Sequence, residues 1–390
     1  MEAILVFSLV LLVAVLISGD ATRGILVTAG LFLLAGLVVG SDVMGLVTIP
    51  ADAPVTIQLA EVTLFAILFG DGLKLRGRDL VTAWTLPGRN ALFHLPFLVA
   101  LIALIAHTVA GLPWLQAWLL GAALSPTDLT FAAATLRSQK VSRELRKLLI
   151  SEKGVNDGLA PLTFVLLLAA AAETRGTVEE TALAVVVGIG CGVVVPWLSL
   201  RLEQTRLAST DMAYEPLNIV AIALLVLSLT SVLGANSFVA AFAAGVTLAS
   251  LSPRRRSGFE RFGNTVSELL KLFTLFIFGT YLSRAVLLEG PILTYLGLAV
   301  LVLLVRPLVL GVLLVKGGLE PAERFVVIWF GPKGFASVVY GLLILQSSLD
   351  NATVLFHYVG LTITLSIALH SLTDLLAARW LRRPEEASKD

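Results

Sequence analysis

Ionisable and amide side chains interrupt long apolar stretches of this sequence. Asn156 and Asp157 stand about midway along the apolar stretch 148–172, and Asp128 lies in an earlier one. A carboxylate withdrawn from bulk water can hold a proton or a dehydrated monovalent cation near neutral pH, but not both together. Asp157 is therefore the candidate site at which a cation and a proton compete. The alternative is a structural Asp157 paired with Lys153, four residues before it on the same helix face.

Two short polar segments, 125–128 (Ser-Pro-Thr-Asp) and 331–334 (Gly-Pro-Lys-Gly), break apolar stretches that are otherwise helical in character. Backbone groups freed by such a break inside a membrane must line a cavity or contact protein. Paired breaks in the two halves of a chain indicate a transporter's substrate site near the bilayer midplane. Asp128 and Lys333 could neutralise the facing helix ends, while Thr127 could offer an oxygen ligand to an ion.

Other ionisable residues also fall within apolar stretches, where an uncompensated charge is costly. Glu152 and Arg306 could form a buried ion pair that stabilises the moving part of the protein. Glu268 and Lys271 are three residues apart and should satisfy each other or face a water-filled cavity. For Asp71 two interpretations remain open, a cavity lining and a position on the ion path.

Composition argues against several other kinds of site. The net charge is +1, so nothing indicates a nucleic-acid partner, and no cofactor is expected beyond the transported ions. The single cysteine cannot form an internal disulfide, and it lies in an apolar run. The histidines show no spacing typical of metal ligands and are interpreted as structural: His94, His107, His357 and His370.

The elements that must position these groups are membrane-spanning helices. Hydrophobic residues make up 57% of the 390 residues and charged residues only 14%, with a mean hydropathy of +0.93. Soluble domains carry about 25% charged residues, and each membrane span needs roughly 20 apolar residues. Thirteen spans are predicted, near 3–18, 24–40, 55–72, 90–110, 114–136, 148–172, 178–200, 214–233, 236–251, 264–283, 291–315, 322–345 and 352–376.

The lysines and arginines give an independent test of this count, because short cytoplasmic loops collect them. With the N-terminus outside and the C-terminus cytoplasmic, 22 of the 28 fall in cytoplasmic loops or the tail, while the opposite loops hold only Arg175 and Arg284. Spans 1–6 and 8–13 then enter the membrane from opposite sides, as inverted six-helix repeats do. The prediction is an all-α, multi-pass protein of the cell (inner) membrane.

Four segments, in order along the chain, resemble the monovalent cation/proton antiporter family, in its electroneutral Asn-Asp branch related to the sodium/proton exchangers. Residues 125–128 are similar to the family's Thr-Asp-Pro break, and residues 152–158 to its Glu-Ser-Gly-Leu-Asn-Asp-Gly signature. Arg306 matches its eleventh-helix arginine, and residues 330–334 resemble its Gly-Pro-Arg-Gly break. Together the Asn-Asp signature and both breaks are fairly specific.

The resemblance implies the sodium/proton antiporter fold with two crossed discontinuous helices, a homodimer in the bilayer, and a core domain that moves as an elevator. It also implies a division into dimerisation segments (1–72 and 211–290), core transport segments (73–175 and 291–378), a linker helix (176–210) and a cytoplasmic tail (379–390).

The same resemblance assigns roles to individual residues. Asp157 would bind the cation or the proton, and Asn156 would hold the site together. Thr127 and Asp128 would lie beside the ion, and Glu152 would pair with the family's eleventh-helix arginine. Asparagine in place of a second aspartate is the family's mark of one-for-one, electroneutral exchange.

The sequence departs from the family at three positions. Lys153 stands where relatives often carry serine, so a tethered ammonium group could compete with the cation one turn before Asp157. Leu129 replaces a proline, so the first break relies on Pro126. Lys333 replaces an arginine, which keeps the charge but not the bidentate geometry.

We therefore expect exchange of Na+, or else K+ or Li+, for H+, and no enzymatic activity. A uniporter or symporter of another small solute on the same scaffold is the alternative that Lys153 raises. An intramembrane aspartyl protease would need two carboxylates sharing a proton. Such a protease also usually carries a Gly-x-Gly-Asp sequence, whose first glycine is absent from residues 68–71.

Overall fold

The computed structural model describes residues 2–17, 25–50, 53–74, 86–127, 160–168, 170–171, 178–203, 214–252, 256–282, 292–313, 325, 328–329 and 331–381. Within these ranges the chain is all-helical, apart from one isolated β-bridge. The helices are α1 (Glu2–Ile17), α2 (Ile25–Val39), α3 (Pro54–Leu73), α5 (Leu86–Ala110), α6 (Trp114–Leu124), α9 (Val178–Glu203), α10 (Glu215–Val232), α11 (Ser237–Leu251), α12 (Arg256–Thr280), α14 (Ile292–Leu313), α16 (Phe335–Leu345) and α17 (Ala352–Leu381).

The positions of the helices agree with the apolar stretches of the sequence. Each of the thirteen predicted spans contains described helical residues. Four described helices are long and apolar enough to cross a membrane, at Pro54–Leu73, Glu179–Glu203, Ile292–Gly311 and Ala352–His370. Other apolar helices are shorter, among them α6 and α16, which adjoin the two predicted breaks.

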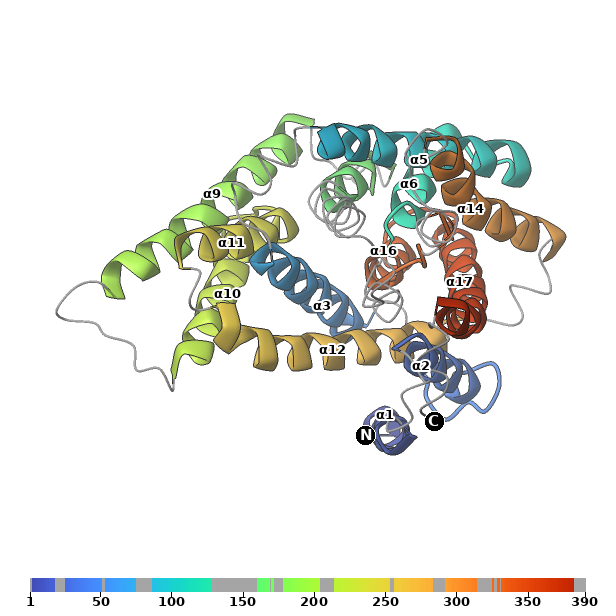
Figure 1. The fold of residues 1–390 in the computed structure, drawn as a ribbon, viewed down its shortest axis with the longest axis horizontal. Helices are drawn as coiled ribbons and strands as arrows, with labels where there is room; N and C mark the ends of the chain where they lie inside the picture. The colour runs from blue at the N-terminus through green and yellow to red at the C-terminus, as the bar shows by residue number, and fades with distance from the viewer. Residues whose placement is uncertain are drawn as a thin grey trace.

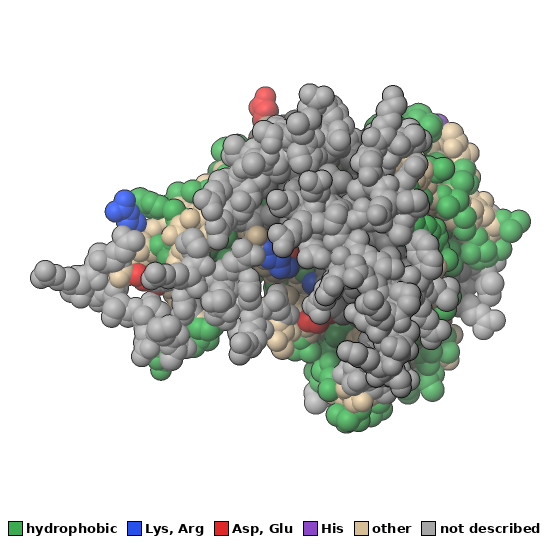
Figure 2. All heavy atoms as spheres, viewed as in Figure 1, with side chains coloured by type: hydrophobic (Ala, Val, Ile, Leu, Met, Phe, Trp, Pro, Cys, Tyr) green, Lys and Arg blue, Asp and Glu red, His purple; other side chains and the backbone are tan. Residues whose placement is uncertain are grey.

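Large apolar side chains cover much of the outer surface of this bundle. Leu5, Val232 and Leu293 have exposed fractions of 72%, 83% and 82%. Where side chains are described on the face in Figure 2, hydrophobic ones predominate and few Lys, Arg, Asp or Glu side chains are visible. Water would penalise so large an apolar surface, whereas lipid tails would not.

The helices form two groups that meet in the middle of the molecule. In one group α3 packs against α11 and α12, α12 against α2, and α9 against α10 and α11. In the other α5 packs against α6 and α14, while α17 packs against α14 and α16. The groups are joined by contacts of α2 with α17 and of α16 with α3 and α12. Figure 1 shows α5, α6, α14, α16 and α17 gathered on one side, with α3 and α12 leading to them from the other helices.

Glycines allow the closest helix crossings in the first group. A Cβ atom at Gly36 in α2 would collide with the carbonyl oxygen of Phe276 in α12, and one at Gly279 would collide with that of Leu33. Because lipid provides little hydrophobic driving force between helices, close backbone packing of this kind must supply the attraction. The crossing of α2 and α12 is therefore a fixed element of the scaffold.

Candidate functional site

The first break lies at the end of α6. The helix stops at Leu124, and the Ser125 N–H still donates to the Gly121 carbonyl oxygen at 2.9 Å. Pro126 has no N–H and cannot continue the ladder, so Thr127 lies in extended backbone. Ser125 and Thr127 are buried, with exposed fractions of 0% and 6%.

The second break lies directly before α16. Pro332 and Lys333 precede Gly334, which is extended (φ −98°, ψ −177°) and forms the N-cap of α16. Lys333 is 2% exposed, although it carries an amine. Both breaks thus fall where proline and glycine predicted them, within the protein interior.

The two breaks contact each other directly. Thr127 and Lys333 form an isolated antiparallel β-bridge, and α6 packs against α16. Backbone groups freed from the two helices therefore satisfy each other inside the bundle, as non-helical backbone at membrane depth must. The two breaks thus face each other at these two residues.

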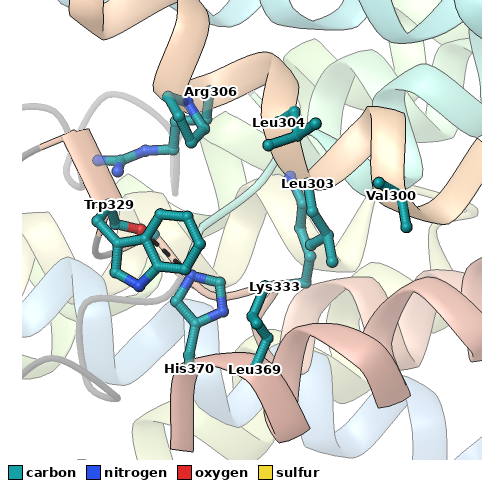
Figure 3. A pocket seen from close by; sticks show the side chains of 10 residues that line it. Val300, Leu303, Leu304, Arg306, Trp329, Lys333, Leu369 and His370 are labelled. Carbon is teal, nitrogen blue, oxygen red and sulfur yellow. Dashed lines mark hydrogen bonds between the residues drawn. The ribbon is translucent and has the colours of Figure 1, made fainter. Parts of the chain in front are cut away.

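A small, mostly apolar cavity adjoins the second break. Its volume is about 70 Å³, and Arg306, Trp329, Lys333 and His370 contribute to its lining. In Figure 3 Arg306 extends from its helix toward the break, and His370 lies beneath Trp329. Arg306 is 2% exposed, so two cationic side chains are buried here. A buried charge is costly unless it is paired, and Glu152 is the partner predicted for Arg306.

Two aromatic contacts connect α16 to its surroundings. The ammonium group of Lys271 in α12 lies 5.3 Å from the ring centroid of Phe335, the first residue of α16. Phe164, in the helical residues 160–168, stacks on Tyr340 in α16 with centroids 4.1 Å apart. That described segment begins three residues after Asp157, so the helix that follows the candidate carboxylate packs on the second broken helix.

A family model described as "Sodium/hydrogen exchanger, transmembrane" matches residues 7–376. The chain belongs to the sodium/hydrogen exchanger family. This match extends over nearly the whole sequence and includes both breaks, so the monovalent cation/proton antiporter resemblance is confirmed. The family consists of transporters, not enzymes, and the aspartyl protease interpretation is set aside.

Curated relatives of this chain are antiporters of distant sequence. The K(+)/H(+) antiporter NhaP of Alkalimonas amylolytica is 23% identical over 99% of this chain and 67% of its own length. The K(+)/H(+) antiporter NhaP2 of Shewanella oneidensis is 22% identical over 96% of this chain and 66% of its own length. A sodium, potassium, lithium and rubidium/H(+) antiporter of Bacillus subtilis is 27% identical over 49% of this chain. The chain spans about two thirds of the length of the first two relatives.

The fold matches a solved exchanger structure. The sodium proton antiporter MjNhaP1 from Methanocaldococcus jannaschii superposes with a TM-score of 0.74 at 20% identity, over 95% of this chain and all of that chain. An electron-microscopy structure of the same protein gives a TM-score of 0.71 over 98% of this chain. The all-helical antiporter fold expected from the sequence is therefore confirmed.

The structure brings three of the predicted site residues together and places a fourth elsewhere. Thr127, Lys333 and Arg306 gather at the paired breaks and their cavity. Asp71 instead accepts a hydrogen bond from the Lys74 ammonium group at 2.6 Å, at the end of α3. This ion pair gives Asp71 a local partner three residues away.

The remaining predicted site residues lie outside the described residues: Asp128, Glu152, Lys153, Asn156 and Asp157. Their roles stay predictions. The predicted ion pair between Glu268 and Lys271 is confirmed, with nitrogen and oxygen 3.9 Å apart.

Two polar residues of α17, Ser366 and His370, also contact the second break. The sequence did not predict these contacts. Ser366 was not among the predicted site residues, but its hydroxyl accepts a hydrogen bond from the Lys333 N–H within the break. His370, interpreted as structural, has its Nε2 3.2 Å from the Trp329 carbonyl oxygen. A partial signal was present in the sequence, because Ser366, His370 and Thr373 recur at helical spacing, although Thr362, Thr364, Ser371 and Asp374 are polar as well.

Proposed function

We propose that this chain is a secondary active antiporter that exchanges a monovalent cation, Na+ or K+ and also Li+, for H+. The observation that carries the proposal is the antiparallel pairing of Thr127 with Lys333. It joins two broken helices inside a bundle whose family consists of sodium/hydrogen exchangers. Paired half-helices at membrane depth supply fixed dipoles and free backbone groups to an ion without an added cofactor.

In this proposal Asp157 is the shared site. Its carboxylate holds a proton when the cation is absent and releases it when a cation binds. Asn156 positions the carboxylate, and the oxygen atoms of Thr127 and Asp128 lie beside the cation. The exchange is electroneutral, because one carboxylate carries either one cation or one proton.

The arrangement around Lys333 supports separate roles for charge compensation. Asp128 and Lys333 neutralise the facing ends of the half-helices, while Glu152 pairs with the buried Arg306. Neither pair transports the ion. Both pairs would keep the broken helices intact while the core domain moves.

The packing of the helices supports an elevator mechanism. We assign α1–α3 and α10–α12 to a dimerisation scaffold, and α5, α6, α14, α16 and α17 to the moving core. The close crossing of α2 and α12 suits a rigid scaffold, and the Lys271–Phe335 contact lies between the two parts. The proposal includes thirteen spans as inverted repeats in the cell (inner) membrane, a cytoplasmic C-terminus and a homodimer.

Transport by the reconstituted chain tests the proposal. Proteoliposomes with an imposed pH gradient and an amine fluorophore report proton release when Na+, K+ or Li+ is added. Wild-type protein should restore fluorescence with at least one of these cations, and Asp157→Asn should abolish the response. Asp350→Asn removes a carboxylate from an exposed turn and should transport like the wild type. Retained exchange in Asp157→Asn would refute the assigned site.

An imposed membrane potential distinguishes electroneutral exchange from exchange that moves net charge. Electroneutral exchange moves no net charge, so its rate should not change when a potential is imposed across the vesicles. An anion-dependent flux that needs no cation would instead favour the uniporter or symporter.

A further inference from the structure

Three polar side chains of α17 share one face of that helix. Ser366, His370 and Thr373 are spaced i, i+4 and i+7, which places them along one stripe. Ser366 and His370 are buried, with exposed fractions of 0% and 5%. Polar groups at such depth are costly unless each has a partner, and the partners of this stripe lie in the second break.

Ser366 binds the chain on one side of the break. The backbone N–H of Lys333 donates to the Ser366 hydroxyl oxygen at 2.9 Å. Lys333 is also the residue that pairs with Thr127. The hydroxyl therefore satisfies an amide that no longer belongs to a helix, at the point where the two breaks meet.

His370 and Thr373 bind the chain on the other side of the break. His370 Nε2 lies 3.2 Å from the Trp329 carbonyl oxygen, and its Nδ1 lies 2.8 Å from the Ser366 carbonyl oxygen. The indole N–H of Trp329 donates to the Thr373 hydroxyl at 2.9 Å. In Figure 3 the dashed line joins His370 to the Trp329 carbonyl, with the two rings close together.

We propose that Ser366, His370 and Thr373 form a break clamp, a set of positioning residues that fix both sides of the second helix break. Through the pairing of Lys333 with Thr127, the clamp also holds the first break in register. It does not contact the transported ion, and its effect on transport rests on the proposed exchange function. Its effect on the backbone does not depend on that function.

Other buried polar residues of α17 show what a purely structural role looks like. The Thr362 hydroxyl donates to the Tyr358 carbonyl at 2.7 Å, within its own helix. His357 Nδ1 lies 2.6 Å from the Thr353 carbonyl, also within the helix. His357 and His370 thus share a helix, burial and a bond to the carbonyl four residues earlier. The second ring nitrogen of His370 reaches the break, which makes His357 the matched control.

The apparent KM for the transported cation tests whether His370 positions the second break. His370→Phe keeps a ring beside Trp329 but removes both nitrogens, and we expect its apparent KM for the cation to rise about two- to tenfold, the effect of one lost hydrogen bond, because a neutral imidazole carries a single N–H. The maximal rate should change less than the KM. His357→Phe should leave the KM within about twofold of the wild-type value, since each hydrogen bond contributes only modestly. Equal changes in the two variants would overturn the clamp.

The Thr373 hydroxyl allows a rescue experiment. Thr373→Val removes the acceptor of the Trp329 indole with little change of shape, and should raise the KM. Thr373→Ser restores the hydroxyl and should restore the KM. Failure of the serine variant to restore the KM would show that packing, and not the hydrogen bond, explains the effect.

Hydrogen–deuterium exchange tests the clamp without transport. Ser366→Ala removes the acceptor of the Lys333 amide, so a peptide covering residues 331–337 should take up deuterium about fivefold faster, as expected for one lost hydrogen bond. Thr362→Val should leave this peptide unchanged. Unchanged uptake in Ser366→Ala would overturn the clamp even if exchange activity is confirmed. Faster uptake would support it even if the proposed ion exchange fails.

Discussion

The guanidinium group of Arg306 lies directly against the α-carbon of Gly331. A Cβ atom at residue 331 would be 2.5 Å from Cδ, Nε and Nη1 of Arg306. Both residues are buried, and a Cβ atom at residue 331 would force the Arg306 side chain to shift. The glycine at the start of the second break is thus packed against a side chain from α14, which the sequence pattern alone does not reveal.

Gly331→Ala should therefore impair both folding and transport. Overpacking of this kind costs about 1–3 kcal/mol, and displacement of Arg306 would also disturb its predicted ion pair with Glu152. The thermal unfolding midpoint in detergent and the initial rate of cation-dependent proton release would measure the two effects. Gly297→Ala is the control, because a Cβ atom there meets nothing within 4 Å on the same helix α14. Equal behaviour of the two variants would contradict the close contact.

Gly36→Ala should weaken the crossing of α2 and α12. The added methyl group would collide with the carbonyl oxygen of Phe276, and neither backbone can yield without separating the helices. We expect a loss of about 1–3 kcal/mol in the free energy of unfolding, seen as a lower unfolding midpoint. Gly190→Ala, where a Cβ atom has open space, should unfold like the wild type. An unchanged midpoint for Gly36→Ala would show that this crossing is not rigid.

The predicted pair of Glu152 and Arg306 can be tested by a double-mutant cycle. Glu152→Gln and Arg306→Gln should each destabilise the protein by about 3–5 kcal/mol, since each leaves a buried charge without its partner. The double variant should lose less than the sum of the two, with a coupling energy of about 0.5–3 kcal/mol.

The pair of Glu268 and Lys271 provides the reference cycle. Its nitrogen and oxygen are 3.9 Å apart and the Glu268 side chain is 37% exposed, so solvent weakens the interaction. We expect a coupling energy of about 0–1 kcal/mol for this pair. Additive effects of Glu152→Gln and Arg306→Gln would rule out their direct pairing.

Lys153→Ser should change which cations are exchanged, or how tightly they bind. Removal of a tethered ammonium group one turn before Asp157 relieves competition for the carboxylate, so the apparent KM for Na+ or K+ should fall. The measurement is the same fluorescence assay performed with each cation in turn. Lys140→Ser, in a predicted cytoplasmic loop, should leave the cation preference as it is. A KM that is unaltered by Lys153→Ser would mean that Lys153 does not face the ion.

Local sequence features predicted the parts of the fold that depend on nearest neighbours. Proline and glycine located both breaks, and α6 does end just before Ser125 while α16 begins just after Gly334. The spacing of Glu268 and Lys271 predicted their ion pair for the same reason, because residues three apart on a helix are neighbours whatever surrounds them.

The partners of His370 and Ser366 come from a distant segment of the chain. His370 and Trp329 are 41 residues apart, and Ser366 and Lys333 are 33 apart. The periodicity of polar residues within α17 does not predict which neighbouring element these residues will contact. The spacing of the three polar residues could be predicted from the sequence, but their hydrogen-bond partners could not.

By itself the sequence determined that this chain is an all-helical membrane protein with two broken helices and a carboxylate-amide pair at Asp157 and Asn156. Hydropathy and backbone-breaking residues act within one or two helical turns, so they can be read without knowledge of the rest of the fold. Only the tertiary structure decided that Thr127 pairs with Lys333, that Arg306 packs on Gly331, and that α17 holds the second break. These contacts depend on how each helix is rotated and crossed against its neighbours, and that is fixed by the packing of the whole bundle at once.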